Sequence, residues 1–353
     1  MRLTYTFRLR TSIALLMLLL GNAVSAQSQN QDGASGHNAS INLLATVRDK
    51  HGKIVATLTK DDFVLTQDDR PQVIQSSTKE SDLPLTIGLV FDTGMNQAGA
   101  LDRERSASHD FLDRILRENK DKAFIIHFDS EVELLQDITN SRDKLFNALG
   151  LLQAARPGFQ SAGDSGEAGE NRQKRGHGSV LYDAVFLACD ELMKTQGGRK
   201  VLIVISDGID RHSKETVGST IESAQRADTL VFNIMFKDEE PAPEHRGFGF
   251  PGGGGMGRPR GGSRPQVPQE TPADAKKILD QVSKATGGAV FEISRKQPID
   301  QTYHTIEDDL QHQYAISYTP EQSGDSSGYH KILLTTKQKD LVVQAKEGFY
   351  AGK

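Results

Sequence analysis

Two apolar segments of this sequence each end on an aspartate. The first, Thr86–Phe91, is followed by Asp92, and the second, Val201–Ile205, is followed by Ser206 and Asp207. Continuous apolar runs of this length are typical of parallel strands that are covered on both faces. Because ligands of open α/β sheets bind beyond the carboxyl ends of such strands, we expect Asp92 and Asp207 to meet at one sheet edge. Two carboxylates with hydroxyl and amide side chains nearby indicate a site for a hard divalent cation.

The N-terminus has the pattern of a secretory signal. A leader with three arginines precedes the apolar stretch Thr11–Leu20, and Ala23-Val24-Ser25-Ala26 follows as a cleavage site. This pattern predicts a signal peptide over residues 1–26, with an uncleaved anchor as the alternative. The apolar stretch is short for a bilayer. We therefore expect an exported protein, periplasmic or extracellular, with no stable membrane span after cleavage.

The net charge argues against a nucleic-acid-binding protein, and the cysteine content argues against a fold held together by disulfide bonds. Removal of residues 1–26 takes away three arginines and no acids, so the formal charge moves from -5 to -8. This balance argues against a nucleic-acid partner, which requires a basic surface. The one cysteine, Cys189, lies in an apolar helical stretch, so no intrachain disulfide forms and the thiol is expected to fill the core.

The rest of the chain alternates between strand and helix patterns, between two β-rich ends. A helix is expected to begin near Ser179, Ser213 is expected to cap the next one, and Thr271 a third. This alternation predicts an α/β fold with a doubly wound, mostly parallel sheet, and a small β unit formed from the N- and C-terminal segments. We expect these segments: a flexible linker over 27–40, an N-terminal β segment over 41–80, the α/β domain over 84–298 with mobile loops at 156–178 and 238–270, and a C-terminal helix and β segment over 299–353.

Three segments that reach the expected sheet edge resemble the metal-ion-dependent adhesion site of von Willebrand factor A domains. That family has D-x-S-x-S after its first strand, a threonine before a middle helix and a later aspartate. Asp92 matches the first acid, Ser179 stands at the threonine position, and Asp207 matches the later acid. The resemblance implies the Rossmann-like fold of that family.

The chain is also similar to a secreted bacterial subgroup of that family, described as VWFA-related and of the acidobacterial type. The similarity covers about residues 41 to 351. It rests on four segments: Val47–Gly52, Leu58–Phe63, Ala285–Gly288 and Gln313–Pro320.

The loop after Asp92 departs from the family pattern. Gly94 and Asn96 occupy the two serine positions, and glycine offers no side-chain ligand. The resemblance implies a degenerate metal site of Asp92, Asn96, Ser179 and Asp207, with Mg²⁺ as the cation and Mn²⁺ or Ca²⁺ as substitutes. Since Mg²⁺ readily keeps waters, a water is able to take the ligand position at Gly94.

The resemblance implies a binding protein and no enzyme. Such a protein would recognise a protein or peptide partner, as in adhesion. An acidic side chain of the partner would complete the coordination shell of the metal. The alternative is an interaction scaffold that binds no metal. A hydrolase is the third hypothesis, because Gly163-Asp164-Ser165-Gly166 resembles a serine-protease motif, although it lies in a polar loop of an α/β chain.

A second metal site is a weaker hypothesis. His304 and His312 flank Glu307 and Asp308 on an expected polar helix. A solvated helix face is the commoner origin of such a pattern.

Overall fold

The computed structural model describes residues 40–79, 82–94, 100–153, 179–236, 271–294, 297–320 and 328–351. All of them lie in one compact unit, Asn38–Lys353. Several predicted segments lie outside the described residues: the signal peptide over 1–26, the linker apart from Ser40, both expected loops (156–178 and 238–270) and the Gly163–Gly166 motif. Asn96 lies outside them as well.

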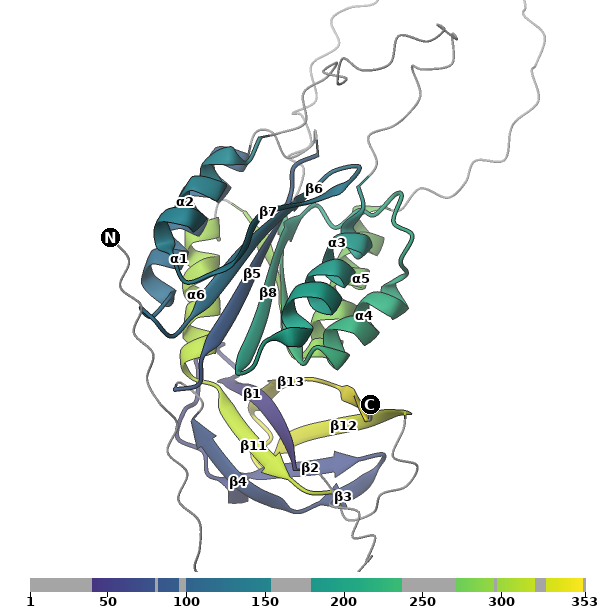
Figure 1. The fold of residues 1–353 in the computed structure, drawn as a ribbon. Coiled ribbons are helices and arrows are strands. Elements are labelled where there is room, and N and C mark those ends of the chain that lie inside the picture. The colour runs from purple at the N-terminus through teal and green to yellow at the C-terminus, as the bar shows by residue number, and fades with distance from the viewer. Residues whose placement is uncertain are drawn as a thin grey trace, which may run out of the picture. The chain divides into compact units, whose positions relative to one another are not determined.

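A six-stranded sheet forms the centre of the α/β domain (Figure 1). Its strand order is β10-β9-β8-β5-β6-β7. Five strands are parallel, and β7 pairs antiparallel with β6 at the edge. The strands are β5 (Leu85–Asp92), β6 (Lys122–Phe128), β7 (Val132–Thr139), β8 (Arg199–Ser206), β9 (Thr229–Phe236) and β10 (Val290–Ile293).

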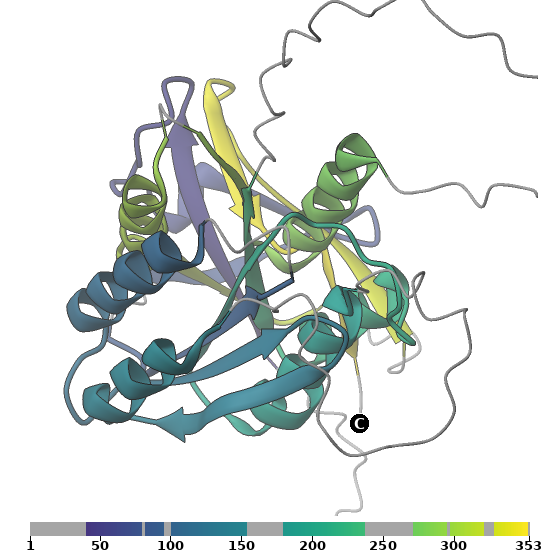
Figure 2. The ribbon, with the colours of Figure 1, turned by 90° about the horizontal axis from the view of Figure 1, so that it is seen from above.

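Helices cover both faces of this sheet (Figure 2). One face packs against α1 (Leu101–Ile115), α2 (Arg142–Leu151) and α6 (Ile299–Gln311). The other packs against α3 (Leu181–Leu187), which continues as a π-helical turn over Ala188–Leu192, and against α4 (Val217–Arg226) and α5 (Pro272–Thr286).

Alternating side chains of β5 supply both cores. Ile87, Leu89 and Phe91 face the first set of helices, and Val90 faces the second. Gly88 allows a close approach, since a Cβ there would lie 2.3 Å from the Phe124 ring and 2.6 Å from Leu202. All eight residues of β5 are buried, as expected for a central parallel strand.

Strands from the two ends of the chain form a separate β unit with two four-stranded sheets, ordered β13-β1-β11-β4 and β14-β12-β2-β3. The central strand β1 pairs with β11 and β13, and β2 pairs with β12. The sheets share a core around Leu43, Phe63, Ile316 and Tyr318. The strands are β1 (Ile41–Asp49), β2 (Phe63–Gln67), β3 (Arg70–Gln72), β4 (Ile74–Lys79), β11 (Tyr314–Tyr318), β12 (Gly328–Thr336), β13 (Leu341–Ala345) and β14 (Gly348–Ala351).

The predicted fold class is confirmed: a doubly wound, mostly parallel sheet and a β unit built from both ends of the chain. Three details differ. The cap of α4 is Thr216 and not Ser213, because the chain from Asp210 to Ser213 makes a turn of its own. Helix α6, assigned above to the C-terminal segment, packs in the α/β core through Tyr303 and Ile306. Strand β14 was not predicted.

The structure also agrees with the predictions for Cys189 and Thr271. Cys189 is fully buried and unpaired, as expected for core filling, and burial raises the pKa of its thiol to about 12. Thr271 caps α5 by accepting a hydrogen bond from the backbone of Asp274, and Gly287 ends that helix in the left-handed conformation.

Among the described residues, no helix combines the length and the apolar character needed to cross a membrane.

Candidate metal-binding site at the sheet edge

Asp92 lies at the carboxyl end of β5 with only 4% of its surface exposed. Its Oδ1 accepts a hydrogen bond of 2.9 Å from the backbone N–H of Gly94. Burial raises the pKa of Asp92 to about 7, and the carboxylates of Asp207 and Asp129 act in the same direction. The side chain is therefore a buried acid whose charged neighbours are also acids, a setting that favours a bound cation.

Asp207 follows the neighbouring strand β8 and is 9% exposed. Pairing of Phe91 with Ile205 brings the ends of β5 and β8 to the same level of the sheet. Gly208 next to it has a φ of +78°, which favours glycine, and its N–H donates to Ser206 Oγ at 3.0 Å. The charge of Asp207 acts on Asp92 from the end of the neighbouring strand and helps to raise its pKa.

Ser179 precedes α3, and two loops hold its backbone. Its carbonyl accepts hydrogen bonds from the N–H groups of Arg211, at 2.9 Å, and His212, at 3.2 Å. The next residue, Val180, donates to the carbonyl of Asp129 at 3.1 Å. The Ser179 hydroxyl is buried and has no hydrogen-bond partner among the residues that the structure describes. A buried hydroxyl without a partner is uncommon and points to an additional ligand.

Asp183 anchors the loop that follows Asp207. Its Oδ1 accepts hydrogen bonds from the N–H groups of Lys214, at 2.9 Å, and Glu215, at 2.8 Å. Its own N–H donates to Ser213 Oγ at 3.1 Å, and the Ser213 hydroxyl donates to Asp210 Oδ1 at 2.6 Å. These contacts attach the start of α3 to that loop and so hold Ser179 near Asp207.

Two acidic residues near this edge were not predicted. Asp129 follows β6, and its carboxylate accepts hydrogen bonds from the Ser130 hydroxyl, at 3.0 Å, and from the Glu131 backbone, at 3.2 Å. A strand ending on an aspartate is the same signal that identified Asp92. Glu104 lies on α1 and is fully buried, and within the described part of the chain neither of its carboxyl oxygens has a hydrogen-bond partner.

Burial, together with the charge of Asp92, raises the pKa of Glu104 to about 8. The sequence signal for its burial is the spacing of the apolar stripe, since it lies three residues after Leu101 and seven before Phe111.

Thr93, His127 and Glu133 form a hydrogen-bonded chain beside Asp92. Thr93 Oγ1 lies 3.0 Å from His127 Nδ1, and His127 Nε2 lies 3.0 Å from Glu133 Oε2. The order resembles a nucleophile, a base and an acid. However, the Thr93 hydroxyl is 1% exposed and donates to the carbonyl of Phe128 at 3.2 Å. These contacts connect the loop after Asp92 with β6 and β7 and brace that loop.

The residues of this edge fit a divalent cation. Asp92 and Asp207 supply carboxylates, and Ser179 supplies an unpartnered hydroxyl. Gly94 has no side chain beside the first carboxylate, where a Cβ would lie 3.0 Å from Asp92 Oδ1. Within the described ranges, no three His, Cys, Asp or Glu side chains form a metal site on their own. A cation here therefore requires the Ser179 hydroxyl and further oxygen donors.

Histidines of α6 are engaged in other contacts. His304 Nδ1 lies 3.6 Å from Glu307 Oε2, and His312 Nδ1 lies 2.8 Å from the carbonyl of Asp308. Both are local contacts within the helix, in keeping with a solvated helix face.

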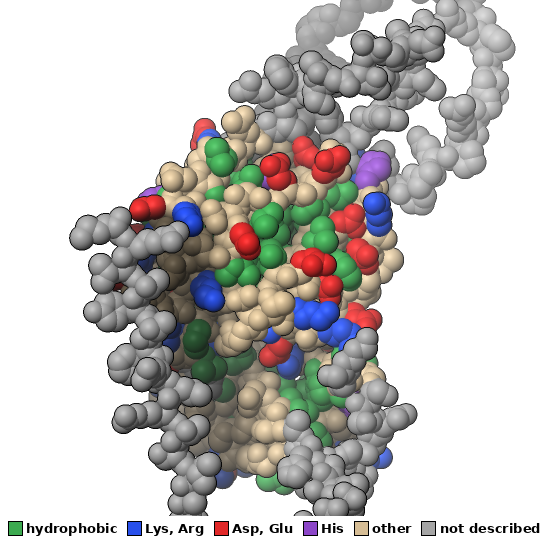
Figure 3. Space-filling view, in the orientation of Figure 1, with side chains coloured by type: hydrophobic (Ala, Val, Ile, Leu, Met, Phe, Trp, Pro, Cys, Tyr) green, Lys and Arg blue, Asp and Glu red, His purple; other side chains and the backbone are tan. Residues whose placement is uncertain are grey.

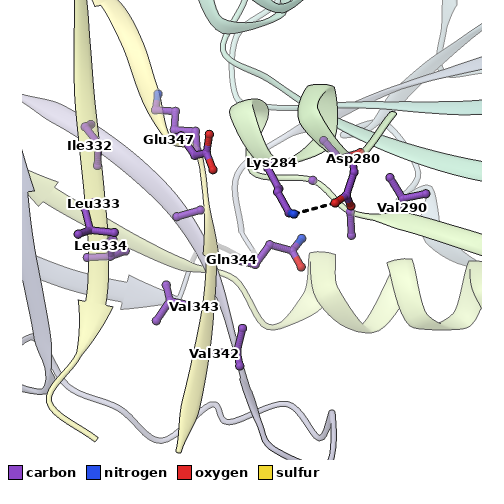
Figure 4. Close-up of a pocket in the computed structure, with 15 residues that line it drawn as sticks. Asp280, Lys284, Val290, Ile332, Leu333, Leu334, Val342, Val343, Gln344 and Glu347 are labelled. Atoms are coloured by element: carbon purple, nitrogen blue, oxygen red, sulfur yellow. Dashed lines mark hydrogen bonds and ion pairs between the residues drawn. The ribbon is translucent and has the colours of Figure 1, made fainter. Parts of the chain in front are cut away.

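A groove of about 440 Å³ lies elsewhere, between α5 and β10 on one side and β12 and β13 on the other (Figure 4). Asp280 and Glu347 are its acidic residues, and Asp280 pairs with Lys284 at 2.7 Å. Leu333 and Val342 are exposed side chains of its β strands. Asp92, Ser179 and Asp207 do not line this groove.

Acidic side chains are distributed over the α/β domain on the face seen in Figure 3, around patches of apolar surface. Among the described residues on that face, Lys and Arg do not form the continuous basic stripe that nucleic-acid binding requires.

No protein-family model matches this sequence, and no curated protein matches it. Among solved structures, the chain is similar to proximal thread matrix protein 1 from the mussel byssus, with 13% identity and a TM-score of 0.44 over 69% of this chain and 49% of that one. It is also similar to the same mussel protein with a zinc-occupied MIDAS motif, with 11% identity and a TM-score of 0.44 over 70% of this chain and 50% of that one. This chain thus spans about half the length of the mussel protein.

A third similar structure is von Willebrand factor type A from Catenulispora acidiphila, with 9% identity and a TM-score of 0.45 over 89% of this chain and 74% of that one. These likenesses are too low for a ligand or partner to be carried over. The family in the name of that structure is the one that the motifs around Asp92, Ser179 and Asp207 resemble.

Proposed function

We propose that this chain is an exported, non-enzymatic binding protein of the von Willebrand A type that recognises a protein or peptide through a divalent cation. Asp92, Asn96, Ser179 and Asp207 would hold the cation, with Mg²⁺ as the physiological ion. The observation that carries the proposal is the buried acid pair Asp92 and Asp207 at one sheet edge, close to loops that hold the unpartnered hydroxyl of Ser179.

The recognition chemistry follows from charge. Two aspartates and two neutral oxygen donors bind a divalent cation without filling its coordination shell. An Asp or Glu side chain of the partner is the natural further ligand, so binding of the partner would depend on the cation. This is binding chemistry, and the Thr93 hydroxyl beside the site is enclosed, with Thr93 only 1% exposed.

Cation titration tests the first step. We expect Mg²⁺ and Mn²⁺ to raise the thermal midpoint of the protein, with the free energy of unfolding increasing by about 2.7 kcal/mol at a concentration 100 times Kd. Asp92→Ala should abolish this response. Asp280→Ala, which removes an acid from the distant groove, should leave it intact. If the wild-type protein shows no response to either ion, the cation-dependent proposal is wrong and the metal-independent scaffold is favoured.

Peptide selection tests the second step. A displayed random peptide library would be selected against the protein in Mg²⁺ and, in parallel, in EDTA. We expect Asp- or Glu-containing peptides to be enriched only in Mg²⁺. Equal enrichment under both conditions would contradict recognition through the cation.

A further inference from the structure

The groove beside α5 is bordered by the open edge of a β strand. Strand β13 lies at the end of its sheet, and β1 is its one neighbour in the sheet order of the described residues. Every residue from Val342 to Glu347 lines the groove (Figure 4). Successive side chains of a strand point to opposite faces, so this unbroken lining means that the backbone edge of β13 borders the groove.

Hydrogen bonding of β1 shows which backbone groups of β13 face outward. The carbonyl of Val47 accepts a hydrogen bond of 2.8 Å from the N–H of Val55, on the side of β1 away from β13. Val47 therefore forms a non-hydrogen-bonded pair with Val343, its partner in β13. It follows that the N–H and C=O of Val343 point away from β1, toward the open edge. Gly287 lies close to the backbone of Ala345, so the open stretch centres on Val343.

Strand β13 lacks the features that protect other edge strands of this protein. Charged residues and proline usually prevent an edge from pairing with another chain. The edge strand β7 carries Glu133 and Asp137, and the edge strand β3 carries Arg70 and Pro71. Strand β13 has the sequence Leu-Val-Val-Gln-Ala, with neither a charge nor a proline. An open, uncharged edge beside a groove is suited to the addition of a peptide strand.

The side chains of the groove indicate the chemistry of its occupant. Leu333 and Val342 are apolar lining residues that are 55% and 63% exposed. The two lysines of the groove each pair with an aspartate, at 2.7 Å in both cases. These ion pairs neutralise the lysines, so the groove favours an uncharged apolar segment over a phosphate or another anion.

We propose that this groove binds an extended peptide segment of another protein, which adds to β13 as a further strand. The N–H and C=O of Val343 would bond to the backbone of the peptide, and its apolar side chains would cover Leu333 and Val342. This second binding site goes beyond the cation site and requires no cation. A second copy of this protein fits less well, because the walls of the groove hold the β13 edge away from the same edge of another copy.

The test removes one backbone donor from the open edge. A displayed library of random peptides of about eight residues, long enough to span β13, would be selected against the wild type in EDTA. One enriched peptide would then be synthesised and its affinity measured by calorimetry. We expect Val343→Pro to weaken binding roughly 10-fold, the effect of one lost hydrogen bond. Proline is tolerated where the N–H of an edge strand is not used within the sheet. Val343→Ala is the matched control, since it shortens the side chain but keeps the N–H, and it should bind as the wild type does.

Hydrogen exchange shows where the peptide binds. We expect the amides of Leu341–Ala345 to gain protection when the peptide is added, and those of the edge strand β3 to remain unchanged. The proposal is overturned if the wild type enriches no peptide in EDTA, or if Val343→Pro binds the peptide as well as Val343→Ala does. If circular dichroism shows that Val343→Pro is unfolded, the double variant Leu333→Ser and Val342→Ser replaces it, and unchanged affinity would again overturn the proposal. Because every step is carried out in EDTA, failure here leaves the cation-dependent function untouched.

Discussion

The carboxylate of Asp309 in α6 lies 2.5 Å from the guanidinium of Arg48 in β1. Asp309 is buried, and no described residue forms a hydrogen bond with its second carboxyl oxygen. This ion pair connects the β unit with the helices of the α/β domain, and it uses one of the two carboxyl oxygens of Asp309.

Asp309 should make stability depend on pH. Burial raises its pKa from 3.8 to about 6, although Arg48 opposes this shift. Between those values the folded protein holds a proton that the unfolded chain releases, so the free energy of unfolding falls as pH rises from about 4 to 6. The contribution is at most about 3 kcal/mol. Urea unfolding at pH 4, 5, 6 and 7 should show this slope for the wild type, and a smaller one for Asp309→Asn.

The control for that measurement is Asp102→Asn, which removes a highly exposed carboxylate from the first turn of α1. It should leave the slope unchanged. Equal slopes for wild type and Asp309→Asn would show that the buried pair does not titrate in this range.

Replacement of Glu104 by leucine should stabilise the protein when no divalent cation is present. The wild-type carboxyl is buried with no hydrogen-bond partner among the described residues, and burial raises its pKa to about 8. The contribution of Glu104 to the free energy of unfolding therefore falls as pH rises from about 4.5 to 8. Leucine has no group to ionise, so it removes this cost of a buried charge. We expect the free energy of unfolding at pH 8 in EDTA to rise by about 1–3 kcal/mol. A large loss of stability would instead assign Glu104 a structural role.

Gly88→Ala should destabilise the central sheet. The added methyl would lie 2.3 Å from the Phe124 ring and 2.6 Å from Leu202, both fully buried. Overpacking of this kind costs about 1–3 kcal/mol, measurable by chemical denaturation. Gly150→Ala is the matched control, because nothing lies within 4 Å of its added methyl and alanine favours the helix α2. That variant should be as stable as the wild type or more so.

Thr216→Ala should fray the start of α4. The Thr216 side chain accepts a hydrogen bond from the backbone of Ser219, and the Ser219 side chain accepts one from the backbone of Thr216. Loss of this cap costs about 1 kcal/mol. Thr216→Ser should retain the stability, as judged by thermal unfolding. If Ser213→Ala frays the helix and Thr216→Ala does not, the cap lies where the sequence placed it.

The fold was largely predictable because its signals are local and repeated. The apolar runs ending at Asp92 and Ser206 lie in neighbouring parallel strands, so the sequence rule that places their ends at one edge holds. The cap of α4 was misplaced because Ser213 and Thr216 are both suitable residues. The choice depends on Asp210 and Asp183, which engage Ser213 in another turn.

The candidate site was less predictable because part of it depends on packing between distant elements. The spacing of Glu104 on the apolar stripe of α1 is visible in the sequence, but the packing of α6 against that helix is not. The placement of Ser179 depends on hydrogen bonds from Arg211 and His212, which no sequence pattern encodes. The roles of Asp92, Asn96, Ser179 and Asp207 in holding a cation remain predictions.

The way the β unit is assembled has a consequence for the order of folding. The backbone of Leu58 bonds to the hydroxyl of Tyr314 across 256 residues of chain, and β1 lies between two strands from the far end. The whole α/β domain is inserted between these partners. Closing so long a loop is entropically unfavourable unless the inserted domain has already become compact and brought its ends together. We therefore expect the α/β domain to fold first. Until it does, the N-terminal strands would present unpaired edges and be most open to pairing with other chains.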